Sequence, residues 1–306
     1  MSKFKTPKVT LGISAYNEQE NIENILNSIC GQKQENFQID RIYVYSDGST
    51  DKTDLIVRAF SQKEGKVALV SDGRRLGKTA RVNQFFAGGR GDILVYLDGD
   101  VVLENEDSLG NAVDWFKDEK VNLVGFNKIP VPARNITEKL INTWFLIWYE
   151  IRKDLEDGHN IHNFSSCAFA VRGDFARKTK CPEGDFSLNK FLFFKAYKSE
   201  RSCRFAKNSV VFYRSPDNVA DRLKQFNRFT NVNKKIAEYF GDWTYGLYKV
   251  PRSAEVKGTI TAFLKNPFWV PLALIFHYVI RSIPTKDEPL IKQGLWETVP
   301  SSKKVI

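Results

Sequence analysis

The sequence predicts an α/β protein with a doubly wound, mostly parallel central sheet and a helical, aromatic-rich C-terminal extension. In the first half of the chain, short runs rich in Val, Ile and Leu alternate with segments of helical periodicity. That alternation is typical of strands buried on both faces and joined by crossover helices. Beyond residue 140 the alternation stops and aromatic residues become frequent. A chain of 306 residues is long enough for one large α/β domain with such an extension.

The first half is predicted to alternate strictly between strands and helices. In chain order the elements are strand Val9–Ser14, helix Glu20–Cys30, strand Arg41–Ser46, helix Asp51–Phe60, strand Val67–Ser71, helix Lys78–Ala87, strand Ile93–Leu97, a helix near Asp107–Lys117 and strand Leu123–Phe126. The first of these helices has Ile22, Ile25, Leu26 and Ile29 on one face, as a helix covering a sheet requires. Strands separated by helices pair in parallel, so the helices cover both faces.

The second half is predicted to be mainly helical. Its elements are a stiff connector Ile129–Pro132, a long helix Thr137–Asp157, a strand Ser166–Val171, helices Phe186–Tyr197 and Val219–Phe240, and a loose end Ser301–Ile306. The long helix presents an aromatic surface that includes Trp144, Phe145 and Trp148.

The charge balance favours an anionic partner. The chain has 46 basic and 36 acidic residues, a formal net charge of +10. Nucleotide phosphate, nucleic acid and an acidic membrane surface all satisfy that charge. The four cysteines form no Cys-x-x-Cys pair, so we expect neither a zinc site nor a disulfide framework. With no apolar N-terminal segment and no run long enough to span a bilayer, we expect a cytoplasmic protein.

Two carboxylates follow the apolar run that ends at residue 97. Asp98 and Asp100 are separated by Gly99 alone, and residues i and i+2 of a strand share one face. The carboxyl ends of parallel strands form the ligand crevice of open α/β sheets. Two hard oxygen donors so close together suit a divalent metal chelated to a diphosphate. The alternative interpretation is a plain Asp-Gly turn.

Three more polar segments follow predicted strands. Ser14-Ala-Tyr-Asn-Glu18 brings an aromatic ring, Tyr16, that can lie against a base, unless Asn17 merely caps a helix. The segment 45–53 places Asp47 where it can accept a hydrogen bond from a base, although a simple turn would have the same composition. The segment 72–83 carries Arg74, Arg75 and Lys78 on a glycine-containing loop, which lacks the P-loop spacing and is otherwise a solvated basic loop.

These segments, in this order, make the chain resemble the family 2 glycosyltransferases with the GT-A fold, over roughly residues 8–230. The resemblance implies that Tyr16, Asn17, Glu18 and Asp47 hold the nucleotide. It places Gly77, Lys78 and Asn83 near the nucleotide as well. It also implies that Asp98 contacts the ribose or the metal and that Asp100 ligates the metal, Mn²⁺ or Mg²⁺.

Two downstream segments resemble further motifs of the family. Pro182–Leu188 is similar to the Glu-Asp-x-x-Leu element, which carries the role of catalytic base to Asp185, although Gly184 stands where an acid is usual. Residues 225–229 resemble the Gln-x-x-Arg-Trp motif, which lies against the acceptor and the diphosphate. The match assigns that role to Gln225, Arg228 and Phe229, with Phe229 in place of Trp.

The resemblance implies an inverting transferase that moves a sugar from a nucleotide-sugar to a hydroxyl of a glycan or polyprenyl-linked acceptor. UDP is the expected nucleotide, and GDP remains open. We expect a catalytic domain over residues 1–240, with a nucleotide-binding half at about 8–127 and an acceptor half at about 128–240. Residues 241–306 are then a membrane-associating extension. The alternatives are a sugar-phosphate nucleotidyltransferase, which would want a glycine-rich N-terminal loop, and a basic nucleotide- or nucleic-acid-binding protein.

The extension contains a candidate membrane contact. Asn266 and Pro267 are typical of a helix start, and Phe268–Ile280 is apolar almost all round with Lys265 and Arg281 beside it. We expect a helix or hairpin set shallowly in an anionic membrane at its cytoplasmic face, with a membrane partner protein possible. A core helix that closes the catalytic domain is the alternative. The basic residues are dispersed and form no recognised motif, so no nucleic-acid partner is expected.

Overall fold

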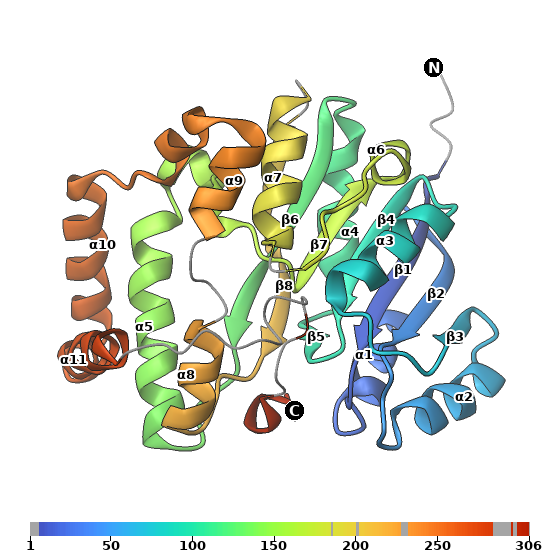
Figure 1. Ribbon diagram of the computed structural model, residues 1–306, viewed down its shortest axis with the longest axis horizontal. Helices are drawn as coiled ribbons and strands as arrows, with labels where there is room; N and C mark the ends of the chain where they lie inside the picture. Colours follow the sequence, from blue (N-terminus) through green and yellow to red (C-terminus); the bar gives the residue numbers. More distant parts are fainter. Residues whose placement is uncertain are drawn as a thin grey trace.

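The described residues of the computed structural model are 6–184, 186–199, 202–227, 232–283, 295 and 299–305. Within them the strands form one sheet in the order β3-β2-β1-β4-β7-β6-β8-β5 (Figure 1). Their bounds are β1 Lys8–Ala15, β2 Gln38–Ser46, β3 Val67–Ser71, β4 Ile93–Asp98, β5 Val101–Leu103, β6 Val121–Pro130, β7 Ala168–Arg172 and β8 Ser202–Tyr213.

The sheet is parallel in its first half and mixed beyond it. β1 pairs in parallel with β2 and β4, β2 with β3, and β6 with β8. β7 is antiparallel to both β4 and β6, and β5 is antiparallel to β8. The predicted fold class is therefore confirmed, with the antiparallel pairs as an addition that strand-helix alternation could not reveal.

Helices cover both faces of the sheet and extend the molecule on one side. Their bounds are α1 Ile22–Cys30, α2 Thr53–Lys63, α3 Lys78–Gly88, α4 Ser108–Val113, α5 Ile136–Arg152, α6 Gly173–Arg177, α7 Leu188–Lys198, α8 Val219–Asn227, α9 Val232–Phe240, α10 Arg252–Lys265 and α11 Trp269–Ser282. Alternate residues of β4 enter two separate cores: Val95 packs in the core beneath α1, and Tyr96 in the core beneath α3. Strand periodicity thus anchors helices on each face.

One close approach in the sheet requires glycine. A Cβ added to Gly12 of β1 would lie 2.6 Å from the ring of Phe85 on α3. The helix α3 can therefore pack directly on β1.

Three predictions about the second half were wrong. The segment Ile129–Pro132 is not a connector, because β6 continues to Pro130, which pairs with Tyr213. The partner strand β8 was not predicted, since polar residues interrupt its apolar pattern.

The helix predicted to reach Asp157 ends at Arg152, because Glu156 and Asp157 have positive φ angles of 49° and 54°. Two shorter helices, α8 and α9, replace the single helix Val219–Phe240.

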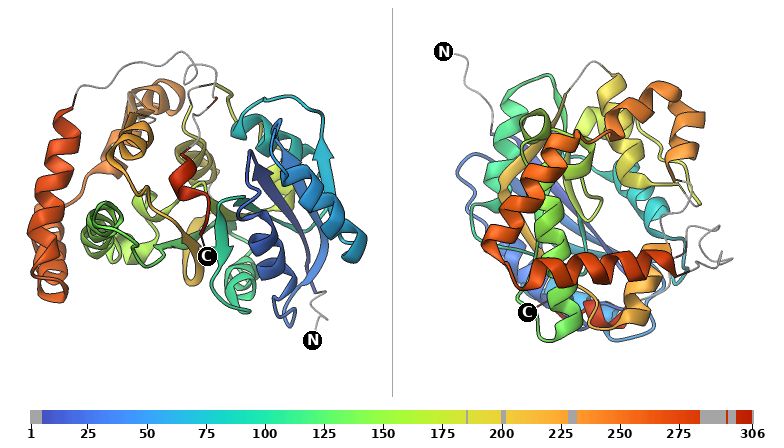
Figure 2. Two further views of the ribbon diagram at one scale, coloured as in Figure 1. Left: turned by 90° about the horizontal axis from the view of Figure 1, so that it is seen from below. Right: turned by 90° about the vertical axis from the view of Figure 1, so that its left-hand side faces the viewer.

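The C-terminal region packs on α5 and then returns toward the sheet. α10 and α11 lie against α5 on the outer side of the molecule (Figure 2). A Cβ on Gly258 of α10 would lie 2.5 Å from Cα of Ile151, so these helices are in backbone contact. Asn266 does not cap α11 with its side chain, because the helix begins at Trp269. No described helix is both long and apolar enough to cross a bilayer.

The predicted loose end Ser301–Ile306 is also wrong in its described part. Pro300–Ser302 forms a short 3₁₀ turn, and Val305 is fully buried against Val102 and Val131. The burial of that side chain, at the far end of the chain, fixes residues 299–305 against the sheet.

Candidate active site

A cavity of about 650 Å³ opens at the carboxyl ends of β1, β2 and β4. Its lining includes Ser14, Tyr16, Asp47 and Asp98, each at or just beyond the end of one of these strands. This is the edge at which open α/β sheets bind ligands, and the volume is typical of small-molecule sites.

The two carboxylates after β4 both line this cavity but differ in their contacts. Asp98 is the last residue of β4 and accepts a hydrogen bond of 2.7 Å from the ammonium of Lys78. Burial raises the pKa of Asp98, and the Lys78 charge opposes that shift. Asp100 stands in the turn before β5, and within the described part of the chain no side chain pairs with it. Its carboxylate is available to a ligand.

A third acid, Glu18, lies beside the pair. Its side chain is buried and its Oε1 is in an ion pair with Lys303, while no hydrogen-bond partner of its Oε2 is found among the described residues. Burial raises the pKa of Glu18 well above its ordinary value, against the opposing charge of Lys303. Burial alone would lower the pKa of Lys303, but Glu18 and Asp100 outweigh it and the net shift is upward. The close contact of the two groups and the upward shift of the Lys303 pKa are consistent with an ion pair between Glu18 and Lys303.

Asp47 and Arg81 fix the loop that precedes α3. Asp47 accepts hydrogen bonds from the backbone N–H groups of Leu76 and Gly77 and from Nε of Arg81, at 2.8–3.0 Å. Arg81 is 1% exposed and also donates to Asp72, whose pKa this hydrogen bond lowers to about 2. Gly77 has a φ of 89°, which favours glycine. The loop is thus held rigidly at the mouth of the cavity.

The aromatic ring of Tyr16 and the guanidinium of Arg75 form one wall of the cavity. The guanidinium of Arg75 lies 4.0 Å from the ring centroid of Tyr16, and both side chains line the cavity. A stacked pair of this kind offers a flat surface to a planar base.

Comparison with known proteins gives the family. The model of glycosyl transferase family 2 matches residues 10–179, more than half of the chain. The chain belongs to this family. It is 31% identical over 121 residues to the glycosyltransferase AglE of Haloferax volcanii. That match covers 40% of this chain and 39% of AglE, so the chain spans about two fifths of this relative's length.

Solved structures support the GT-A fold of this family 2 protein. One is the mannosyltransferase PcManGT from Pyrobaculum calidifontis in complex with GDP-Man and Mn²⁺, with a TM-score of 0.60 and 20% identity over 92% of this chain and 77% of that one. Another is glucosyl-3-phosphoglycerate synthase from Mycobacterium tuberculosis with Mn²⁺, UDP and phosphoglyceric acid, with a TM-score of 0.50 and 18% identity. That match covers 77% of this chain and 79% of the synthase.

Most of the residues singled out in the family 2 motifs lie together. The cavity is lined by Tyr16, Glu18, Asp47, Gly77, Lys78, Asp98, Asp100 and Gln225. Asn17 is absent from the lining: its φ is 55°, and its Oδ1 accepts a hydrogen bond of 2.8 Å from the Thr50 N–H. Asn83 is also absent, because its amide exchanges two hydrogen bonds with the backbone of Cys181. Asp185, Arg228 and Phe229 lie outside the described residues.

The side chain of Asn83 bonds to the backbone of a segment that is distant in sequence. Its two bonds to Cys181, of 2.9 and 2.8 Å, tie α3 to the segment that leads to residue 184. The helix α3 and the segment that precedes Asp185 are therefore joined by one side chain.

Several lining residues were missed by sequence reasoning. Arg222 lies three positions before Gln225 on α8, and this helical spacing could have indicated it. His277 of α11 stacks on Trp144 of α5 with ring centroids 3.6 Å apart, and both line the cavity. Burial, with Arg222 and Arg281, lowers the pKa of His277 to about 4, so this ring is neutral at pH 7. Nothing in the sequence indicates that α11 reaches the cavity.

The acids fit a hard divalent cation shared with a phosphate ligand. Among the residues that the structure describes, no group of three or more His, Cys, Asp or Glu could hold a metal alone. Mg²⁺ is commonly held by one or two carboxylates plus substrate phosphates. The unpaired carboxylate of Asp100, with Asp98 beside it, supplies that number of protein ligands.

Proposed function

We propose that this chain is an inverting, metal-dependent glycosyltransferase that moves a sugar from a nucleotide-sugar to a hydroxyl of a lipid-linked or glycan acceptor. Membership of family 2 supports sugar transfer. The observation that carries the proposal is the shared cavity of Asp98 and Asp100 with the cations Lys78 and Arg75. Carboxylates for a metal and cations for a diphosphate are both needed to bind a nucleotide-sugar.

The base and the diphosphate of the donor would occupy neighbouring parts of the cavity. The base would stack on Tyr16 and Arg75, and Asp47 would accept a hydrogen bond from it. Oδ2 of Asp47 has one hydrogen bond in the structure, from Gly77, and so retains capacity to accept another. The diphosphate would lie between Lys78 and the Asp98–Asp100 pair. UDP is our default nucleotide, although the two solved relatives include one with GDP-Man and one with UDP.

Catalysis would combine charge stabilisation with general-base chemistry. A divalent cation at Asp98 and Asp100, as both of those solved relatives have Mn²⁺, would neutralise charge on the departing diphosphate. Lys78 holds Asp98 in place through its 2.7 Å hydrogen bond. Asp185 would take the proton of the acceptor hydroxyl, and Gln225, Arg228 and Phe229 would contact the acceptor and the diphosphate. A single displacement inverts the anomeric carbon.

A panel of sugar nucleotides tests this proposal. The chain is incubated with UDP- and GDP-sugars, with Mn²⁺, Mg²⁺ or EDTA, and released nucleoside diphosphate is measured. We expect metal-dependent release from one donor class, stimulated by a membrane or glycan extract. Formation of sugar nucleotide from sugar phosphate and nucleoside triphosphate would instead indicate a nucleotidyltransferase. Absence of any nucleotide binding would contradict the proposal.

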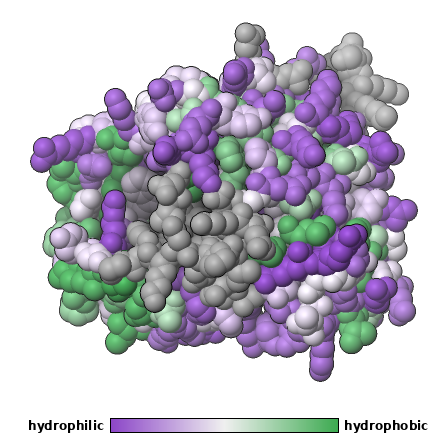
Figure 3. Space-filling model, in the orientation of Figure 1, coloured by the Kyte–Doolittle hydropathy of each residue, from purple (hydrophilic) through white to green (hydrophobic). Residues whose placement is uncertain are grey.

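We further propose that the apolar outer surface of α10 and α11 contacts an anionic membrane. Ten large apolar side chains are exposed there: Val256, Ile260, Phe263, Leu264, Phe268, Leu272, Leu274, Ile275, Tyr278 and Val279. This surface forms part of the hydrophobic area on the side of α10 and α11 in Figure 3. A patch of this kind, with Lys257 and Lys265 on the same helix, is typical of interfacial binding.

The same helix connects this surface with the cavity. His277 of α11 lines the cavity, while Ile275 and Tyr278 of α11 are 62% and 74% exposed. An acceptor with an apolar chain would thus approach the cavity beside α11, past Trp144 and His277, which both line it.

Introducing two negative charges on the outer surface of α10 and α11 should weaken membrane binding. The variant Leu264→Glu/Ile275→Glu should bind vesicles of phosphatidylglycerol and phosphatidylcholine at least about tenfold less well, because it removes buried apolar contact and adds repulsion. Vesicle co-sedimentation measures the effect. Leu55→Glu is the control, since Leu55 is 68% exposed on α2, away from this surface. Equal binding by all proteins would contradict the membrane contact.

A further inference from the structure

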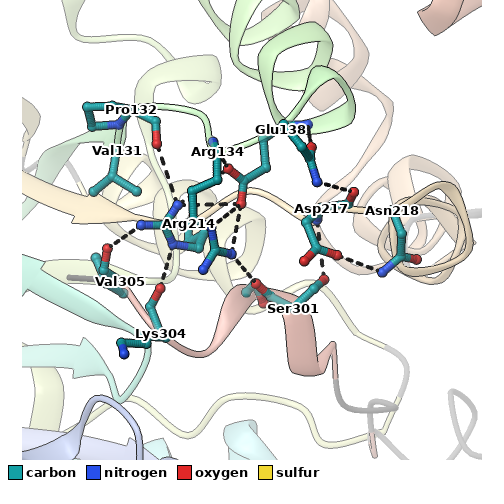
Figure 4. A network of polar contacts seen from close by, with 12 residues as sticks. Val131, Pro132, Arg134, Glu138, Arg214, Asp217, Asn218, Ser301, Lys304 and Val305 are labelled. Carbon is teal, nitrogen blue, oxygen red and sulfur yellow. Dashed lines mark hydrogen bonds and ion pairs between the residues drawn. The ribbon is translucent and has the colours of Figure 1, made fainter.

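The residues 299–305, here called the C-terminal strap, are anchored by two arginines that surround the buried Glu138. Arg214, which follows β8, donates to the backbone oxygens of Lys304 and Val305 at 2.5 and 2.9 Å (Figure 4). Arg134 donates to the backbone oxygen of Ser301 at 3.4 Å. Both guanidiniums contact Glu138, which is 1% exposed. The strap is therefore held by specific contacts to α5 and to the end of β8.

A second anchor comes from α8. The Ser301 hydroxyl donates to Asp221 at 2.7 Å, and the Asp217 N–H donates to the same hydroxyl at 3.4 Å. Because α8 also carries Arg222 and Gln225 in the cavity lining, the strap and the expected acceptor helix form one unit.

The strap projects one cation into the acidic cluster. Lys303 lines the same cavity as Asp98 and Asp100, and its ammonium contacts the Glu18 carboxylate and the Tyr16 backbone oxygen, the latter at 3.2 Å. An ammonium has three donors. Two are used by these acceptors, and within the described residues no third acceptor is present. The remaining N–H is available to a ligand in the cavity.

We propose that Lys303 is a donor-binding residue whose ammonium hydrogen-bonds the diphosphate of the nucleotide-sugar. The inference rests on the proposed function, because it takes the donor as given. A lysine is a common ligand of phosphate, and a charge-assisted hydrogen bond is stronger than a neutral one. The strap is then part of the donor site, together with the residues at the carboxyl ends of β1, β2 and β4.

A purely structural ion pair with Glu18 is the competing explanation. In that case Lys303 would need only the Glu18 carboxylate as its partner. The ion pair would then be the same whether the cavity is empty or holds a ligand. The open third donor and the position beside the proposed metal acids favour contact with a ligand.

Calorimetric titration of the full chain with Mn²⁺ and UDP or GDP tests the inference. Lys303→Met should weaken binding of the nucleoside diphosphate about 10- to 100-fold, and Lys303→Arg should recover part of the loss. Binding of the matching nucleoside, which has no phosphate, should change less than threefold. That difference separates a phosphate contact from a general loss of structure. Lys304→Met is the matched control, because its side chain is exposed and the strap uses only its backbone oxygen.

Each outcome decides between explanations. Unchanged diphosphate affinity in Lys303→Met would overturn the inference and leave a structural ion pair. Tighter binding would also overturn it and would mean that Lys303 competes with the metal for the acids. If thermal melting shows that Lys303→Met does not fold, the same titrations with Lys303→Gln decide between the two explanations. A wild-type chain that binds no nucleoside diphosphate would overturn the proposed function itself.

Discussion

Asp100→Asn is expected to lower metal-dependent sugar transfer at least about a thousandfold without unfolding the protein. Asp100 lines the cavity and, within the described residues, accepts no hydrogen bond and forms no ion pair, so asparagine at this position breaks no direct contact. Asparagine keeps the size of the side chain but removes the negative charge that would bind Mn²⁺ or Mg²⁺. Charge stabilisation by a metal contributes several kcal/mol to a barrier, and each 1.36 kcal/mol is about tenfold in rate. Release of nucleoside diphosphate across a Mn²⁺ titration measures the effect.

Two further variants test whether the loss of metal-dependent transfer is specific to Asp100. Asp107→Asn removes an exposed carboxylate at the start of α4 and should leave the rate unchanged. Asp185→Asn should keep nucleotide and metal affinity but reduce transfer about a hundredfold, because it removes the proposed base. A metal-dependent rate in Asp100→Asn equal to that of wild type would exclude Asp100 as a ligand. Normal transfer in Asp185→Asn would direct the search for the base to Glu183.

The second large effect is on stability: Arg81→Leu should lower the free energy of unfolding by about 3–5 kcal/mol, since it breaks a buried ion pair and leaves one charge uncompensated. Arg81 and Asp47 are 1% and 5% exposed, and their contact is 2.9 Å. That cost is a large share of the roughly 5–15 kcal/mol that stabilises a typical protein. Urea unfolding followed by circular dichroism measures it.

Two controls distinguish the stability lost with the Asp47–Arg81 ion pair from the stability lost by shortening an arginine side chain. Arg58→Leu changes an exposed arginine of α2 and should alter the stability by less than about 0.5 kcal/mol. The double variant Asp47→Asn/Arg81→Leu should be less destabilised than the sum of the single variants, because no buried carboxylate is left unpaired. Additive effects would show that the two side chains act independently.

The sequence predicted the elements of the first half of the chain well because their signals are local. Each strand of that half is a short apolar run, and each polar segment follows a strand directly, so strand ends alone bring Tyr16, Asp47 and Asp98 to one edge. The register of β1 with β2 and β4 then fixes their proximity. Asn17 and Asn83 belong to these segments, but their side chains bond to Thr50 and Cys181, which are distant in sequence, and neither lines the cavity.

The second half of the chain was predicted less well because its contacts join residues that are distant in sequence. β8 carries a polar middle that hides its alternation, and only pairing with β6 defines it. The stacking of His277 on Trp144 joins two helices that no sequence pattern connects. Lys303 follows a segment without periodicity, and its role depends on an anchor, Arg214, that belongs to an unpredicted strand end.

The long-range contact between Lys303 and Glu18 bears on how the protein is made. These residues are 285 positions apart, so a ribosome synthesises nearly the whole chain between them. The sheet of the first half can form while translation continues, since domains fold as their residues emerge. The pocket, however, lacks one wall until residue 303 has left the exit tunnel. A nascent chain can therefore acquire a folded core well before it acquires the complete pocket.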